Sequence, residues 1–132
     1  MEERIGLIDI GSNTIRLVIF RFSKDAGLNE LLNIKTPARL SQYLTKENKM
    51  SQEGINVLIE ALRSFKSVSE KFKVKTLHPI ATAAIRQSEN KDDIVKRVKD
   101  ELDIEISIIP EKEEAYYGYY CLLYTSPSPR DR

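Results

Sequence analysis

The segment from Asp9 to Thr14 constrains the fold most strongly, because a short polar turn there separates two apolar stretches. Residues 5–8 are apolar, and residues 15–20 are rich in β-branched side chains, which favour strands. Two such stretches joined by a Gly-Ser-Asn turn predict a β-hairpin. The chain is therefore expected to begin with antiparallel sheet that carries a polar tip.

The residues of this turn suit a ligand that carries phosphate. Gly11 has no Cβ, so backbone or a ligand can approach it closely. The Ser12 and Asn13 side chains and the N–H groups of the turn form a nest for phosphate oxygens, and Asp9 offers a carboxylate to a Mg²⁺ that bridges phosphates. A plain hairpin with a polar tip explains the same residues, so both interpretations stay open on chemistry alone.

Strands and helices alternate along the rest of the chain. A turn at 24–27 and a third strand at 28–34 extend the hairpin into a meander. Residues 35–50 are polar and predict a long loop with one helical turn. Ser51 is a suitable N-cap for a helix that runs to about Lys71. Its apolar residues recur on one helical face, and they are Ile55, Leu58, Ile59, Leu62, Phe65 and Val68.

The later segments repeat this alternation. Residues 74–81 read as a strand, and Asn90 is expected to cap a second helix. Residues 105–109 alternate as a fifth strand, and Pro110 opens a final helix at about Glu111. The second helix has a buried stripe at Ile94, Val95, Val98 and Leu102.

The order of elements is therefore β-β-β-α-β-α-β-α. Strand–helix–strand crossovers are right-handed and make the joined strands parallel. The prediction is an α/β fold with a mixed five-stranded sheet. This plan resembles the ribonuclease H-like fold of actin and the sugar kinases, a superfamily in which the first hairpin turn holds phosphate.

Composition narrows the class of protein. The chain has 132 residues, 41% hydrophobic and 31% charged, which is typical of one globular domain or part of one. A net charge of +1 argues against nucleic-acid binding. No apolar run approaches the roughly 18 residues of a membrane span. One cysteine and a start without signal-peptide features favour a cytoplasmic protein.

Two further segments carry charged residues with more than one interpretation. Arg86 follows the small residues 81–84 and can bind phosphate oxygens as a fork, or it is a solvated arginine at a helix start. Glu113 and Glu114 lie in the first turn of the last predicted helix. One of them activates water, or both complement the helix dipole.

Two other features have structural interpretations. His78 has no neighbouring ligand residues in the sequence and is read as structural. Four tyrosines recur at helical spacing near the end of the chain and are expected to pack in a core or interface. They are Tyr116, Tyr117, Tyr119 and Tyr120.

The turn at 9–14, residues 81–86 and residues 113–115 together resemble the N-terminal domain of the Ppx/GppA family, over about residues 4–120. This family contains exopolyphosphatases and guanosine pentaphosphate phosphatases. The resemblance implies Mg²⁺-dependent hydrolysis of a terminal phosphoanhydride bond in a polyphosphate or guanosine pentaphosphate substrate. It also implies that the parent protein is a homodimer.

The resemblance assigns roles to individual residues. Glu114 matches the catalytic carboxylate that orients or deprotonates water, and it is also a metal ligand together with Asp9. Arg86 matches a phosphate-binding arginine. The first phosphate loop corresponds to Gly11, Ser12 and Asn13.

The chain also departs from the family pattern. Pro110 and Glu111 stand where the family often has Ser-Gly. The family's second, glycine-rich phosphate loop is not found here, so residues 1–120 are expected to be an incomplete domain with little activity alone. Residues 121–132 change to a Ser/Pro composition, and their back-translation resembles a sequencing-library adapter, which predicts a non-native tail.

Four functions therefore stay under consideration. Exopolyphosphatase activity and guanosine pentaphosphate hydrolysis both follow from the resemblance. An actin-like or sugar-kinase-like ATP-binding protein would share the fold, but the Glu113-Glu114 pair argues against it. A non-catalytic module that only binds polyphosphate would keep the phosphate loop without needing Glu114.

Overall fold

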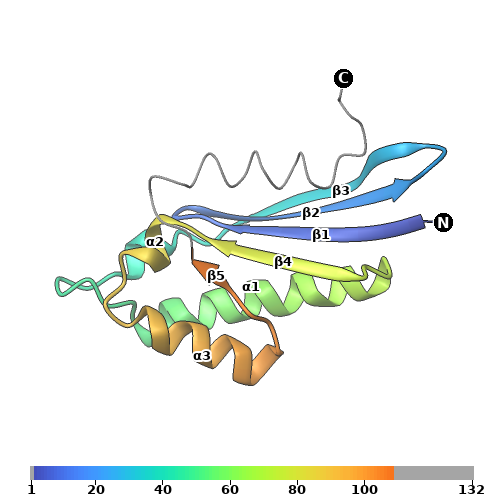
Figure 1. Cartoon of the computed structure of the whole chain (residues 1–132). Coiled ribbons are helices and arrows are strands. Elements are labelled where there is room, and N and C mark those ends of the chain that lie inside the picture. Colours follow the sequence, from blue (N-terminus) through green and yellow to red (C-terminus); the bar gives the residue numbers. More distant parts are fainter. Residues whose placement is uncertain (1, 109–132) are drawn as a thin grey trace.

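Residues 2–108 form a five-stranded sheet with two long helices packed on one face (Figure 1). The computed structural model describes residues 2–108. Strands β1 (Glu2–Ile10), β2 (Thr14–Ser23) and β3 (Gly27–Pro37) form an antiparallel meander. Strand β4 (Thr76–Ala81) pairs parallel with β1, and β5 (Ser107–Ile108) pairs parallel with β4. The sheet order is β3-β2-β1-β4-β5, which confirms the predicted mixed sheet.

Strand β3 is longer than the sequence predicts. Gly27 begins it with a φ of 76°, a conformation that glycine adopts without a steric penalty. The strand then continues to Pro37, where a loop is expected from Lys35 onward. Lys35 pairs with Arg16, and Pro37 with Thr14, so the backbone of β2 keeps a partner up to the hairpin turn.

The long helix α1 (Gln52–Lys71) begins where the sequence predicts. The Ser51 hydroxyl accepts a hydrogen bond from the Gly54 N–H at 3.1 Å, as an N-cap should. A short 3₁₀ helix, η1 (Leu40–Tyr43), supplies the single helical turn expected before α1. Gly54 faces this turn, and a Cβ there would clash with the Tyr43 side chain.

Helix α3 (Lys91–Leu102) also matches its prediction, but the role assigned to Asn90 is wrong. Asn90 occupies the N-cap position and makes no capping hydrogen bond with its side chain. Its Oδ1 instead accepts from the Met50 N–H at 3.0 Å, and its Nδ2 donates to the Met50 carbonyl at 3.1 Å. An amide has both a donor and an acceptor, so it satisfies two backbone groups here instead of the one that a cap would satisfy.

The hydrophobic core lies between the sheet and the two long helices. Alternate residues of β1 and β2 point toward α1 and α3, as a half-buried sheet requires. Within the described residues 2–108, no helix is long and apolar enough to cross a membrane. Hydrophobic residues with no solvent exposure are Ile8, Ile10, Ile15, Leu17, Ile19, Leu40, Leu58, Leu62, Ala81, Ile85, Ile94 and Val98.

The end of the described chain is less regular than predicted. Ile104 and Ile106 are buried and Glu105 is exposed, so the predicted alternation is present. Pairing with β4 nevertheless begins only at Ser107. The final helix expected from Glu111, the tyrosines and the predicted tail lie outside the described residues.

Candidate functional site

The Gly11–Asn13 turn between β1 and β2 is closed by its own backbone. The Gly11 N–H donates to the Thr14 carbonyl at 3.0 Å. A Cβ added to Gly11 would lie 3.0 Å from the same carbonyl oxygen, which is tighter than most such contacts. The sequence predicts that either backbone or a ligand approaches Gly11 closely. The structure shows the backbone approach.

The carbonyl groups of the turn face the segment that follows β3. The Asn13 carbonyl accepts from the N–H groups of Ala38 at 3.0 Å and Arg39 at 2.9 Å, and the Ser12 carbonyl accepts from the Ser41 N–H at 3.1 Å. In a trans peptide the C=O and the next N–H point in opposite directions. The Asn13 N–H therefore points away from residues 38–41, as a donor to an external anion must.

Arg86 lies at the same end of the sheet. It is the last residue of the short helix α2 (Ala83–Arg86), which follows β4 directly and lies near the β1–β2 turn (Figure 1). Thr82 fixes the start of this segment to β1, because its N–H and its hydroxyl both donate to the Ile10 carbonyl at 3.2 Å. Arg86 is half-buried and lies at the end of α2, not at a helix start.

A second arginine, which the sequence interpretation did not single out, lies beside the turn. Arg16 on β2 is the register partner of Asp9 on β1, so the two residues project from the same face of the sheet. Arg16 is half-buried, and its Nη1 donates to Asn33 Oδ1 at 2.7 Å on β3. The pairing of Arg16 with Asp9 follows from the register of β1 and β2. The sequence alone does not give that register.

The expected metal site is described only in part. Asp9 is exposed next to the end of β1, whereas Glu113 and Glu114 lie outside the described residues. Within residues 2–108, no three His, Cys, Asp or Glu side chains gather as a metal cage. Mg²⁺ commonly binds one or two carboxylates and completes its shell with water and substrate phosphates. Asp9 fits that mode of binding.

Other polar features lie away from this end of the sheet. A cavity of about 510 Å³ lies along β4 and includes Lys66, Lys75 and His78 in its lining, but none of the candidate residues within 2–108. At the C-terminal end of α3, a hydrogen bond from Lys99 and its positive charge hold the pKa of Asp103 below its usual value. These features do not contribute to the candidate site.

The mixed sheet and its helices define an α/β domain of the ribonuclease H-like kind. Residues 18–131 match the sequence profile of the Ppx/GppA phosphatase family. The chain belongs to the Ppx/GppA phosphatase family.

Individual relatives agree with this assignment. The chain is 26% identical to exopolyphosphatase 1 of Mycobacterium tuberculosis over 112 residues, which are 85% of this chain and 33% of that protein. The crystal structure of the Aquifex aeolicus family member matches with a TM-score of 0.84 and 29% identity, over 94% of this chain and 40% of that one. An exopolyphosphatase from Cytophaga hutchinsonii matches with a TM-score of 0.80 and 29% identity, over 86% and 36%. The chain thus spans about a third of the length of the curated relative.

These similarities confirm the resemblance and the fold predicted from the sequence. Gly11, Ser12 and Asn13 lie in the β1–β2 turn, and Arg86 ends α2 at the same end of the sheet (Figure 1).

Proposed function

We propose that this chain carries the first phosphate-binding half of an enzyme that hydrolyses the terminal phosphoanhydride bond of inorganic polyphosphate. The orientation of the β1–β2 turn carries this proposal. The Ser12 and Asn13 carbonyls are engaged by residues 38–41, so the Asn13 N–H points away from that segment, in the direction from which an anion would bind. The name of the Mycobacterium relative and that of the Cytophaga structure favour polyphosphate as the substrate.

The basic residues at this end of the sheet complement such a substrate. Arg86 offers a planar guanidinium that binds two phosphate oxygens at once. Arg16 adds a second positive charge on the face that carries Asp9. Together they favour a terminal phosphoryl group placed next to the Ser12-Asn13 backbone, where positioning supplies much of the rate in phosphoryl transfer.

The remaining chemistry is assigned to two carboxylates. Glu114 would accept a proton from the attacking water or orient it. Asp9 and Glu114 would hold Mg²⁺, which would neutralise negative charge on the phosphate oxygens. Asp9 adjoins the phosphate loop on β1, as this assignment requires.

The decisive variant is Glu114→Gln in the full-length protein. We expect release of orthophosphate from polyphosphate to fall about 10²–10⁴-fold while polyphosphate binding is kept, because the amide preserves the shape and cannot take a proton. The neighbouring Glu113→Gln is the matched control and should keep most of its turnover. Near-normal turnover in Glu114→Gln would leave Glu114 as an acid that only complements a helix dipole.

The same assay separates the competing functions. Competition between polyphosphate and guanosine pentaphosphate in one reaction gives the ratio of their kcat/KM values. If the ratio favours guanosine pentaphosphate, that nucleotide replaces polyphosphate as the proposed substrate. Binding of polyphosphate without any turnover in the wild-type protein would instead identify a non-catalytic binding module. Membership of a phosphatase family disfavours the actin-like and sugar-kinase-like alternative.

A further inference from the structure

Residues 38–50, which we call the brace, connect the two parts of the candidate site. At its first end, the brace donates three N–H groups to the Ser12 and Asn13 carbonyls, at 2.9 to 3.1 Å. Arg39 takes part with a left-handed backbone, at a φ of 52°. Residues other than glycine avoid this conformation unless their surroundings impose it. The first end of the brace is therefore built around the carbonyls of the phosphate loop.

At its second end, the brace holds the segment that follows Arg86. The Asn90 side chain pairs with both backbone groups of Met50, at 3.0 and 3.1 Å. The Glu89 N–H donates to the Asn48 carbonyl at 2.7 Å. Three hydrogen bonds thus join the brace to residues 89 and 90, which lie 40 residues further along the chain.

Contacts within the brace connect its two ends. Leu40 is fully buried, and an isolated bridge pairs Leu44 with Met50. The Ser51 N–H donates to the Tyr43 carbonyl at 2.9 Å. A shift of Met50 is therefore transmitted to η1, and from there to the donors that hold the phosphate loop.

The segment between Asn90 and Arg86 is equally well held. The Ser88 hydroxyl donates to the Ala84 carbonyl at 2.8 Å, and its N–H donates to the Ile85 carbonyl at 3.0 Å. Ser88 is 1% exposed and Ile85 is fully buried. Residue 90 thus has a fixed relation to α2, which carries Arg86.

We propose that Asn90 is a positioning residue: acting through the brace, it sets the spacing between the Ser12-Asn13 phosphate loop and Arg86. Asn90 touches no candidate ligand atom itself. The inference rests on the proposed phosphate-binding role of that loop and of Arg86. It adds that the two elements bind phosphate as one unit, whose geometry depends on a side chain outside the site.

Two measurements on the chain test this, with Asn90→Ala, the near-isosteric Asn90→Asp, and Asn29→Ala as a matched control. Asn29 makes its hydrogen bond to Ala26 in the β2–β3 turn, well away from the brace. The first measurement is amide hydrogen exchange without ligand. We expect exchange at the Ala38, Arg39 and Ser41 N–H groups to rise about tenfold in both Asn90 variants and to stay unchanged in the control.

The second measurement is the affinity for magnesium tripolyphosphate, followed by the amide shifts of Ser12 and Asn13. We expect Asn90→Ala to weaken binding about tenfold with Arg86 present and less than about twofold in an Arg86→Ala background, since residues that act as a unit are not additive. A purely structural asparagine would give the same loss of affinity in both backgrounds.

The outcomes separate the two proposals. The role of Asn90 would be overturned if Arg86→Ala weakens tripolyphosphate binding but Asn90→Ala has no effect on it. It would also be overturned if Asn90→Ala weakens binding equally with and without Arg86. Faster exchange confined to Met50 and Glu89 would overturn it as well. Unchanged affinity in Arg86→Ala would contradict the proposed function instead, and the exchange rates at Ala38, Arg39 and Ser41 would then decide on the brace alone.

Discussion

Thr82 shows how a residue at the edge of the site serves the fold. Thr82 lies among the small residues 81–84, and its hydroxyl is buried and donates to the Ile10 carbonyl. This bond joins the end of β4 to the end of β1, next to the β1–β2 turn. The side chain therefore holds two strand ends together before any ligand binds.

We expect Thr82→Val to lower the free energy of unfolding by about 1 kcal/mol, because it removes one buried hydrogen bond while keeping the shape. Thr82→Ser keeps the hydroxyl and is the matched control. Urea denaturation of the three proteins measures the difference. Equal midpoints for Thr82→Val and the wild type would show that the backbone N–H of residue 82 is sufficient to hold the Ile10 carbonyl.

At the scale of elements, Gly54 in the first turn of α1 is explained by a neighbour and not by the helix. Helix propensity alone favours alanine there by about 1 kcal/mol. The structure places the Tyr43 side chain against this position, and a Cβ would also lie 2.9 Å from Met50 Cγ. The brace and α1 can therefore meet closely only because residue 54 has no side chain.

Gly54→Ala is expected to destabilise the chain by about 1–3 kcal/mol, because overpacking outweighs the gain in helix propensity. Thermal unfolding measures the change. Gly54→Ala combined with Tyr43→Ala should recover part of the loss. A more stable single variant would show that Tyr43 moves aside at little cost.

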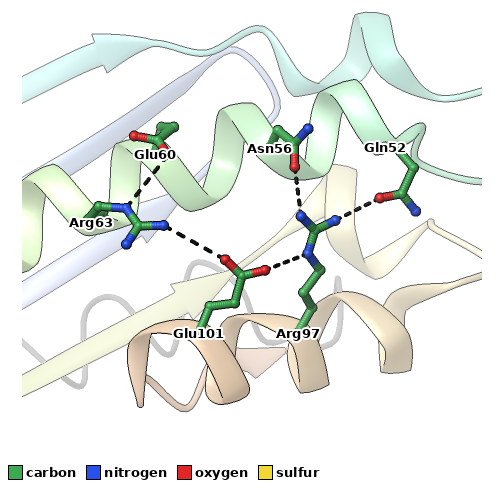
Figure 2. Close-up of polar contacts among 6 residues, drawn as sticks. All are labelled: Gln52, Asn56, Glu60, Arg63, Arg97 and Glu101. Atoms are coloured by element: carbon green, nitrogen blue, oxygen red, sulfur yellow. Dashed lines mark hydrogen bonds and ion pairs between the residues drawn. The ribbon is translucent and has the colours of Figure 1, made fainter.

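A polar network on the outer surface joins α1 to α3 (Figure 2). Arg97 on α3 donates to Glu101 at 2.8 Å, and across to Gln52 at 2.7 Å and Asn56 at 2.8 Å on α1. Arg63 on α1 reaches Glu101 at the longer distance of 3.7 Å. The guanidinium of Arg97 thus satisfies three acceptors with one planar group.

We expect Arg97→Ala to cost about 1 kcal/mol of stability, and Arg97→Lys to recover less than half, since an ammonium group cannot reproduce the planar fork. Arg63→Ala is the control and should cost less, because its ion pairs are long and exposed. Chemical denaturation at low and high salt measures all three. Full recovery by lysine would mean that the charge of Arg97, and not its planar fork, accounts for its contribution to stability.

At the scale of the whole molecule, most of the sheet and both long helices are predictable from local pattern. Ser51, followed by apolar residues at helical spacing, locates α1, and the alternation of β1 and β2 identifies their buried faces. The true end of β3 at Pro37 is not predictable in this way. It depends on pairing with Thr14, and a polar sequence does not reveal that pairing.

The sequence indicates which residues are candidates for the site, but it does not indicate which other segments hold them in place. The turn and Arg86 are recognisable from their motifs, and the structure brings both to one end of the sheet. The brace and the role of Asn90 are not recognisable from the sequence, because a single sequence does not show which distant segments share backbone hydrogen bonds. The importance of Arg16 depends likewise on the register opposite Asp9.

The strand order β3-β2-β1-β4-β5 has a consequence for the time course of folding. The meander β1–β3 pairs neighbours in the chain, whereas β1 and β4 pair Ile5 with Thr76 across the whole of α1. Pairing between strands that are far apart in the sequence has a larger entropic cost of loop closure, so it forms more slowly. In pulsed hydrogen exchange during refolding, amides of the β1–β2 hairpin should gain protection before those of β4. Simultaneous protection would indicate a single nucleus that already includes the β1–β4 pairing, and the β1–β2 turn would then acquire both of its neighbouring segments in one cooperative event.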